Sequence, residues 1–456
     1  MNLLEESYSM LRLFPLIVLL CVSLFAHSQT DVAILSLEEC VRYAVKHSTK
    51  VKKAGLDQVE FDYKFQANKG LAFPQVSGSI KYDSYPVLPT QVFPGDFLNL
   101  PNDIAVQIGK PHNLAAGIEF SQIIFDRQLF MGLQRGKSTQ VLYTLLVEKT
   151  EEEVAYEVAT NYMQALNTQT QLKIIEANME KLRRIGEIAK VQFENDLITK
   201  TDVNRIRVNE SNLRSKREQL LIGLAYQLNI LKFLMGMPQE EIVRLDESLA
   251  EAKPNIDLLG SIRLNLEETV THRLIKQREE LNYWEQRYIK GKYFPKILGL
   301  GSLSAQAQRD RFSFFSTNRP WFGTVYLGVH VQAPLFDGFQ TKRSVLEAGV
   351  RLQKLELDKA QNAMFQELSF AHNRQKLRQI YDNLDTEQAN VELADEVYQQ
   401  TTLQYKEGIA SLTDLLTAET TLREARVNYS QQVIACKIAE LDLMNSAGMI
   451  RSLYAE

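Results

Sequence analysis

The stretch QYKEGIASLTDLL, from Gln404 to Leu416, has a counterpart, QFENDLITKTDVN, from Gln192 to Asn204. Both begin with glutamine and an aromatic residue, both contain a short break, and both reach Thr-Asp at the same position. Sliding residues 192–237 by 212 positions without a gap produces nine identities in 46 positions, against roughly three expected by chance. One chain therefore builds the same helix–turn–helix unit twice.

The remainder of the chain repeats with small offsets. Three further pairs of segments correspond, namely LEECV (37–41) with LEETV (266–270), FPQVSGS (73–79) with FPKILGL (294–300), and IIFD (123–126) with PLFD (334–337). The sequence therefore predicts two repeats, 29–237 and 265–456, joined by a linker over 238–264. Each repeat is expected to contain a helix, two strands, a very long helix, a tight turn and a closing helix, with strands at about 74–84, 113–125, 296–308 and 323–336 and turns at 195–199 and 407–411.

The balance of charge excludes two classes of protein. The chain of 456 residues carries 52 lysines and arginines against 56 aspartates and glutamates. The two numbers are nearly equal, and the sequence has neither a basic stripe that would bind nucleic acid nor an acidic tail typical of disorder. The length suffices for a large core or several domains.

The first 28 residues have the pattern of a secretory signal peptide. Arg12 precedes the apolar run LFPLIVLLCVSLFA, and Ala26 and Ser28 provide small residues at the −3 and −1 positions of a cleavage site. Because acidic residues are unusual ahead of such a run, Met10 is an alternative start. Cys21 raises the alternative of a lipoprotein, although its neighbours fit a lipobox poorly.

Beyond Ser28 no stretch approaches the roughly 18–20 apolar residues of a transmembrane helix. The chain is therefore expected to be exported without a membrane-spanning helix. Two cysteines follow, Cys40 and Cys436, each at an apolar helical position. They are expected to be buried thiols, and the alternative is a disulfide in an oxidising compartment.

Two stretches, from Arg127 to Glu194 and from Gln340 to Glu407, lack proline and contain little glycine. A helix of such length would reach about 100 Å. In the last helix the apolar residues recur with a mean spacing of 3.5, at Leu415, Ala418, Leu422, Ala425, Tyr429, Val433, Cys436, Ala439 and Leu443. Such a repeat keeps one seam against a neighbouring helix. Spacing alone leaves open a plain coiled coil or a solvent-bridging bundle.

Shorter stretches alternate apolar and polar residues. In 76–83, Val76, Ile80 and Tyr82 alternate with serines, a lysine and an aspartate. The same alternation holds for 113–122 and 324–332 and is weaker over 297–308. Runs of about ten residues with one apolar face suit a membrane β-barrel with lipid outside and water inside, although a soluble half-buried sheet would alternate in the same way.

Two features favour the barrel. One is the export signal. The other is the gathering of aromatic residues in the loops between strands, at Phe93 and Phe97 in the first repeat and at Phe312, Phe314, Phe315, Trp321 and Phe322 in the second. Such clusters are typical of the girdles at membrane interfaces.

One chain provides only four such strands, which cannot close into a barrel. Open sheet edges are not tolerated in lipid, and even about eight strands fill their own interior with side chains. Several copies must therefore contribute. Three copies would provide about twelve strands and a pseudo-sixfold ring of long helices.

These segments match a known family. The chain resembles TolC-type outer-membrane efflux proteins (outer membrane factors) over residues 36–450. The resemblance rests on the FPQV and FPKI strand entries, the FDG strand exit at 336–338, and above all the hairpin QYKEGIASLTDLLTAETTL at 404–422. It implies an α+β membrane protein, with four strands per chain in a trimeric, twelve-stranded transmembrane β-barrel and long coiled-coil-like helices forming a periplasmic α-barrel.

The resemblance also implies a homotrimer in the outer membrane of a Gram-negative bacterium, with a long periplasmic portion. Such a trimer is an exit duct for small molecules or ions, served by a periplasmic adaptor (membrane fusion) protein and an inner-membrane pump of RND, ABC or MFS type. Type I protein secretion is an alternative use of the duct. A non-conducting periplasmic helical scaffold is an alternative from another class. The family likeness implies no cofactor, metal or nucleic-acid partner.

By the same resemblance, the two Thr-Asp pairs lie near the closed periplasmic end. Asp414 matches the aperture-lining aspartate of the family, and Asp202 is its repeat partner; Thr413 and Thr201 lie beside them. A ring of carboxylates in a narrow pore favours cations and stores like-charge repulsion. The alternative is that both aspartates cap helices or are solvated surface acids.

Tyr405 and Phe193 place an aromatic residue near this gate, with core packing as the alternative. The turns also carry exposed aliphatic residues, which suit the docking of adaptor hairpins, whereas ordinary turn chemistry is the alternative. The residues expected to contact the adaptor are Leu197, Ile198, Thr199, Gly408, Ile409, Ala410 and Ser411. Ala410 stands where some family members have a latching arginine, and Thr417 where a second acid is expected, which argues against that latch and against a double acid ring.

The sequence shows no pattern typical of an enzyme. A nucleophile–base pair, a phosphate loop and a metal-spaced cluster are all missing from it. The histidines share no motif, and His330 on the polar side of a strand is the one that could line a barrel. We therefore expect no enzymatic activity.

Overall fold

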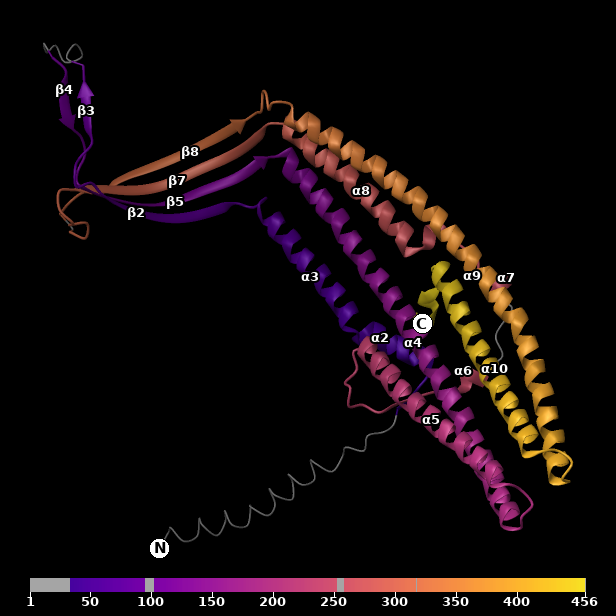
Figure 1. Ribbon diagram of the computed structural model, residues 1–456. Coiled ribbons are helices and arrows are strands. Elements are labelled where there is room, and N and C mark those ends of the chain that lie inside the picture. Colours follow the sequence, from indigo (N-terminus) through magenta and orange to yellow (C-terminus); the bar gives the residue numbers. More distant parts are fainter. Residues whose placement is uncertain (1–32, 95–101, 252–257, 317, 456) are drawn as a thin grey trace, which may run out of the picture. The chain divides into compact units, whose positions relative to one another are not determined.

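The structure is a computed structural model that describes residues 33–94, 102–251, 258–316 and 318–455 (Figure 1). The predicted signal peptide with Cys21, the aromatic Phe97 and part of the predicted linker lie outside the described residues. The chain divides into two compact units, one made of residues up to 54, 148–269 and 364 onward, the other of 55–147 and 270–363. Each unit therefore takes segments from both sequence repeats.

Two very long helices dominate the chain, and both lie where the sequence lacks proline. They are α4 (Arg127–Glu194), with 68 residues, and α9 (Gln340–Lys406), with 67. The other helices are α2 (Leu37–His47), α3 (Thr49–Gly70), α5 (Lys200–Met235), α6 (Ser248–Glu251), α7 (Leu258–Ser261), α8 (Val270–Lys290) and α10 (Leu412–Ser446), with short 3-10 turns at Leu266–Glu268, Gly291–Tyr293 and Ile450–Leu453. No helix of the described residues combines the length and the apolar character needed to cross a membrane.

The second unit contains an antiparallel sheet of four strands in the order β2-β5-β7-β8. These strands are β2 (Gln75–Ser84), β5 (His112–Phe125), β7 (Lys296–Arg309) and β8 (Phe322–Gln332) (Figure 1). Four strands lie near the predicted ranges, although β8 ends at Gln332 rather than near 336, and the two strands of the first repeat pair with the two of the second through β5 and β7. Within this sheet, β2 and β8 each pair on one side only.

The register brings the apolar side chains of all four strands to one face. Ile118 of β5 lies opposite Leu303 of β7, which lies opposite Val325 of β8. The other face collects polar partners such as Ser77, Glu119, Ser302 and Tyr326. On the apolar face Val325 and Leu327 are 70% and 83% exposed in the single chain. The alternation predicted from the sequence is therefore real, and its apolar side is uncovered in one copy.

Two small strand pairs were not predicted. β3 (Thr90–Phe93) and β4 (Ile104–Gln107) form a hairpin in the loop between β2 and β5. In the first unit, β1 (Ala33–Leu35) runs parallel to β6 (Val243–Leu245). Three- and four-residue strands are too short to show a period in the sequence.

The main core of the first unit lies where α2, α4, α5 and α10 pack together. Tyr162 is fully buried in this core and donates hydrogen bonds to the carbonyl oxygens of Leu35 and Asp246, at 3.1 and 3.0 Å. The phenol thereby ties the β1–β6 pair to α4, because a buried hydroxyl needs a partner.

The 3.5-residue stripe predicted for α10 faces the interior. Seven of its positions are buried, and Ala425 and Tyr429 are half-buried. Cys436 belongs to the stripe, and Cys40 lies in the core beside α4; both thiols are free and buried. Burial raises the pKa of Cys40 to about 12 and of Cys436 to about 11. The expectation of buried thiols is confirmed.

Candidate functional site

The two repeated stretches fold into two turns with the same backbone path, one joining α4 to α5 and the other joining α9 to α10. The second residue after each long helix takes the left-handed conformation, Asp196 with φ of 57° and Gly408 with φ of 74°. The next amide closes the helix end: Leu197 N–H donates to the Gln192 carbonyl at 2.9 Å, and Ile409 N–H to that of Gln404 at 2.8 Å. Such bonds satisfy carbonyls left open at a helix C-terminus.

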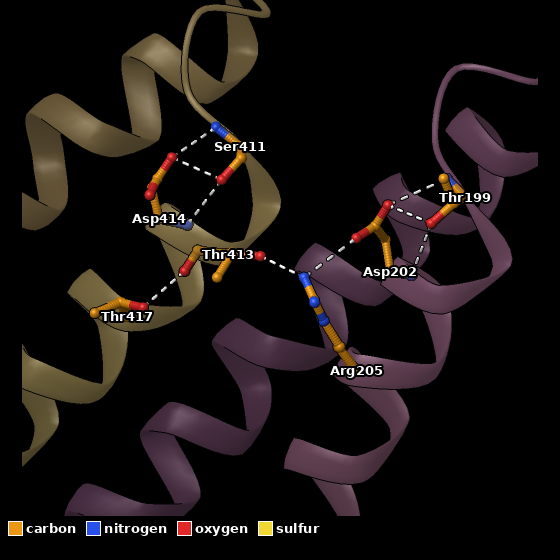
Figure 2. Close-up of polar contacts among 7 residues, drawn as sticks. All are labelled: Thr199, Asp202, Arg205, Ser411, Thr413, Asp414 and Thr417. Atoms are coloured by element: carbon orange, nitrogen blue, oxygen red, sulfur yellow. Dashed lines mark hydrogen bonds and ion pairs between the residues drawn. The ribbon is translucent and has the colours of Figure 1, made fainter.

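Each following helix begins with a capping box (Figure 2). Oδ2 of Asp202 accepts from the amide and hydroxyl of Thr199, at 3.2 and 2.7 Å, while Thr199 Oγ1 accepts from the Asp202 amide at 3.3 Å. Oδ2 of Asp414 accepts in the same way from the amide and hydroxyl of Ser411, at 3.0 and 2.6 Å. The Thr-Asp repeat of the sequence thus places each aspartate at the third helical position.

The capping bonds keep both aspartates ionised. Hydrogen bonds from the Ser411 hydroxyl and amide lower the pKa of Asp414, and those from Thr199 lower the pKa of Asp202. A helix N-terminus also favours a negative charge. In the single chain both aspartates therefore cap helices, as the alternative interpretation expected. The capping hydrogen bonds of each aspartate carboxylate engage only its Oδ2 atom. Oδ1 of Asp414 accepts no hydrogen bond from the described residues, and this side chain is exposed.

Arg205 links the two hairpins, a contact that the sequence did not reveal (Figure 2). Its Nη1 donates to Thr413 Oγ1 at 2.5 Å and lies 3.7 Å from Asp202 Oδ1. The repeat counterpart of Arg205 is Thr417, whose hydroxyl donates to the Thr413 carbonyl at 2.8 Å. The two repeats carry different residues at this pair of positions, and that difference was the signal in the sequence that could have pointed to the contact.

The two aromatic residues near the turns differ in environment. The Tyr405 hydroxyl donates to Gln192 Oε1 at 2.7 Å, and the half-buried ring packs on the cluster around Ile206 and Leu415. Burial raises the pKa of this phenol. Phe193, its repeat partner, is 40% exposed. Core packing, the alternative considered for both, thus describes Tyr405 and not Phe193.

Each turn exposes one aliphatic residue and inserts the next. Leu197 and Ile409 are 73% and 77% exposed, whereas Ile198 is half-buried against the cluster of α4, α5 and α10, and Ala410 is also half-buried. Thr199, Thr201, Gly408, Ser411 and Thr413 are exposed. Among the residues expected to contact an adaptor, the large aliphatic side chains of Leu197 and Ile409 are therefore accessible.

An open groove of about 520 Å³ lies between α5 and α10 just behind the turns. It is lined mainly by hydroxyl and amide side chains, from Thr201, Asn204, Arg205, Val208, Asn209, Thr413, Leu416, Thr417, Thr420 and Thr421. Among the described residues no cluster of three or more histidine, cysteine or acidic side chains could hold a metal ion.

The sequence analysis also missed a buried acidic residue, Glu419, which lies a little more than one helical turn after Asp414 in α10. Glu419 is 6% exposed, its Oε1 has no hydrogen-bond partner among the described residues, and burial raises its pKa. Arg423 on the same helix and Lys181 on α4 offset this effect electrostatically. In the sequence, Glu419 is indistinguishable from the surface acids of α10.

Comparison with known proteins finds a family whose model matches part of the chain. The model of the family described as "Outer membrane efflux protein" matches residues 282–449. Over this segment, in the second half of the sequence, the chain is similar to outer membrane efflux proteins.

Solved structures of bacterial outer membrane proteins share the fold of this chain at low sequence identity. The CmeC outer membrane channel of Campylobacter jejuni superposes with a TM-score of 0.72 over 91% of this chain and 85% of its own, at 14% identity. VceC of Vibrio cholerae superposes with a TM-score of 0.69 over 90% and 96%, also at 14% identity. The α+β fold predicted from the sequence is thereby confirmed.

A curated relative is the nodulation protein T of Rhizobium leguminosarum bv. trifolii, 22% identical over 289 residues. The match spans 61% of this chain and 59% of the length of that protein. The chain thus shares its fold with bacterial outer membrane channels, whereas its sequence is only distantly similar to those of the proteins compared.

Proposed function

We propose that this chain is the subunit of an outer-membrane exit duct that passes small molecules or ions out of the periplasm. The observation that carries the proposal is the sheet of the second unit. One of its faces is apolar and uncovered, the other is polar, and its two edge strands, β2 and β8, are each paired on one side only among the described residues. In lipid, every backbone group must find a partner, so these edges must be paired by other copies.

The strand directions suit such closure. Because the four strands alternate in direction, β8 of one copy can pair antiparallel with β2 of the next, and the apolar faces then form one continuous outer surface. Three copies would give about twelve strands, enough to leave a water-filled interior. We infer a homotrimer on this basis.

The long helix α9 supports association of copies. It exposes apolar residues four or seven positions apart, at Leu346, Val350, Leu357, Met364 and Leu368. A stripe with this spacing is the seam of a coiled coil, and soluble surfaces rarely leave so much apolar area uncovered. A neighbouring copy would cover it.

The two hairpin turns would form the periplasmic aperture. The repeats 29–237 and 265–456 each contribute one turn, so three copies would provide about six turns around one opening. We propose that Asp414, and less directly Asp202, line this opening and favour cations. Tyr405, Phe193, Thr413 and Thr201 lie next to the gate in this proposal.

The exposed tips would be the contact for a periplasmic adaptor. Leu197 and Ile409 protrude from the turns, and the neighbouring Ile198, Thr199, Gly408, Ala410 and Ser411 complete the two surfaces. An inner-membrane pump of RND, ABC or MFS type would drive export through that adaptor. Export of proteins by a type I system would use the same duct, with the cargo selected by the pump.

The experiment is the recording of single-channel currents after the purified full chain is added to planar lipid bilayers. The duct predicts stable, cation-preferring conductance steps. A folded protein that inserts into the bilayer without any current would instead support the non-conducting scaffold and overturn the proposal.

A further inference from the structure

The described residues of the loop between β7 and β8, 310–316 and 318–321, pack onto the sheet at the strand ends opposite those that lead into the helices. The rings of Phe312 and Phe314 meet Tyr82 edge-on, with centroids 5.6 and 6.1 Å apart. Phe314 is only 2% exposed and also contacts Trp321, at 6.5 Å. The loop is therefore an ordered aromatic cap rather than a loose connection.

Polar bonds fasten the base of this cap. Arg309 is 4% exposed and donates from Nη2 to the Pro320 carbonyl at 2.9 Å. Tyr82 and His112 share a hydrogen bond of 2.8 Å, and Lys110 pairs with Asp310 at 2.9 Å.

The cap covers the end of the apolar face. The register places Arg309 opposite His112, and His112 opposite Ser84. These positions share the face of Ile118, Leu303 and Val325, since side chains of paired residues point the same way. The aromatic cap thus continues the apolar surface that the proposed barrel turns toward lipid.

What the cap leaves exposed combines aromatic rings with positive charge. Phe315 is 88% exposed and Phe312 62%. Arg311 and Arg319 are exposed, and within the described residues no hydrogen bond or ion pair engages either guanidinium group. Lys110 lowers the pKa of Asp310 through its hydrogen bond, and Arg319 adds to this effect, so these charges lie together.

We propose that this rim surface, formed by Lys110, Arg311, Phe312, Phe315 and Arg319, binds a lipid with a phosphorylated headgroup in the outer leaflet. The proposal rests on the proposed barrel. Guanidinium groups bind phosphate oxygens in pairs of parallel hydrogen bonds. Aromatic side chains settle at the level of lipid headgroups, and acyl chains would then lie along Val325 and Leu327.

A lipid is favoured over a free phosphate ion by the geometry. The exposed rings lie within the same short loop as the free arginines, and both continue the apolar face of the sheet. A soluble anion would use the arginines and leave these rings and the adjacent apolar face uncovered.

The test is the retention of lipid by the purified full chain, measured by native mass spectrometry after washing in detergent. The probes are lipid A, its enzymatically dephosphorylated form, and phosphatidylcholine. We expect lipid A to be retained about tenfold more than the other two, a preference of about 1.4 kcal/mol. Equal retention of the phosphorylated and dephosphorylated forms by the unmodified protein would overturn the proposal.

Two variants sharpen the result. The triple variant K110S/R311S/R319S is expected to lose the preference, whereas the matched control R184S/K190S/R207S, which removes three exposed basic residues of α4 and α5, is expected to keep it. If the paired variant F312S/F315S retained lipid A fully and inorganic phosphate displaced it, the surface would be an anion site and the lipid proposal would be wrong.

Single-channel currents of the same preparations separate the two proposals. If the unmodified protein showed no preference for lipid A but gave normal currents, the lipid site would be rejected and the duct would stand. Absence of currents from the unmodified protein would reject the duct.

Discussion

The turn between α4 and α5 and the turn between α9 and α10 follow one backbone path, 212 positions apart. Their caps match bond for bond, but their side chains do not. The first turn places Asp196 in the left-handed position and carries Arg205, whereas the second places Gly408 there and carries Thr417. The residues that the two hairpins share are those that a tight turn between helices requires. The residues that differ are those through which each hairpin contacts its own neighbours.

The largest expected effect comes from breaking the second turn. Gly408→Pro would force φ from 74° to about −65° and remove the amide that donates to the Tyr405 carbonyl at 3.1 Å, at a cost of about 3 kcal/mol or more. Drug export measured in cells should fall to the level of a deletion strain, while trimer formation survives. Asp196→Gly, which keeps the left-handed conformation, is the control. Normal export by the proline variant would refute the docking role.

A second comparison concerns the two aspartates. Asp414→Asn should lower the cation preference of single-channel currents about severalfold, because Oδ1 of Asp414 is free of hydrogen bonds from the described residues. Asp202→Asn should have a smaller effect, since Arg205 lies 3.7 Å from Oδ1 of Asp202 and already offsets its charge. Equal currents from wild type and both variants would rule out a pore-lining role.

The pH dependence of the same currents follows from the capping bonds. The ordinary pKa of 3.8 is lowered for Asp414 in the folded chain, so its charge and its contribution to the helix cap are fully present above that value. Both are lost only as pH falls through the lowered pKa. Cation preference should therefore stay constant from pH 8 to pH 5. A midpoint near pH 6 would show that repulsion within a ring outweighs the capping bonds.

A smaller effect distinguishes the two left-handed residues. Gly408→Ala should destabilise its turn by about 1 kcal/mol, and Asp196→Gly should stabilise the other by about 0.5 kcal/mol. Hydrogen exchange of the amides around Ile409 and Leu197 reports each turn separately. If both substitutions changed the exchange rates in the same direction, the left-handed backbone at Asp196 would not be strained as we infer.

The smallest effect is expected at the link between hairpins. Arg205→Ala removes an exposed contact worth about 0.5 kcal/mol or less, so amides at the start of α10 should exchange about twofold faster. Thr417→Ala, at the equivalent repeat position, is the control and leaves the link intact. An unchanged rate in the arginine variant would mean that the contact does not hold the hairpins together.

Much of the architecture could be predicted because it depends on local patterns. Long proline-free runs predicted α4 and α9, and the alternation around Ile80 and Val325 predicted one apolar face of the sheet. The β1–β6 pair could not be predicted, because three residues show no period and the partners are over 200 positions apart.

The contacts of the site were less predictable. Thr-Asp at equal spacing indicated the caps, but the hydrogen bond of Arg205 with Thr413 joins residues 208 positions apart. Phe193 and Tyr405 occupy equivalent positions, yet one is exposed and the other hydrogen-bonded to Gln192. Such differences arise from packing between hairpins, and a sequence repeat cannot reveal them.

The most direct test of the central claim is the native mass of the purified protein in detergent. The 52.2 kDa chain has a sheet whose two edge strands are each paired on one side only within the described residues, so we predict a complex of three copies that persists when the detergent is diluted. A stable single copy with a folded sheet would contradict the account, because its edge strands would then need no neighbour.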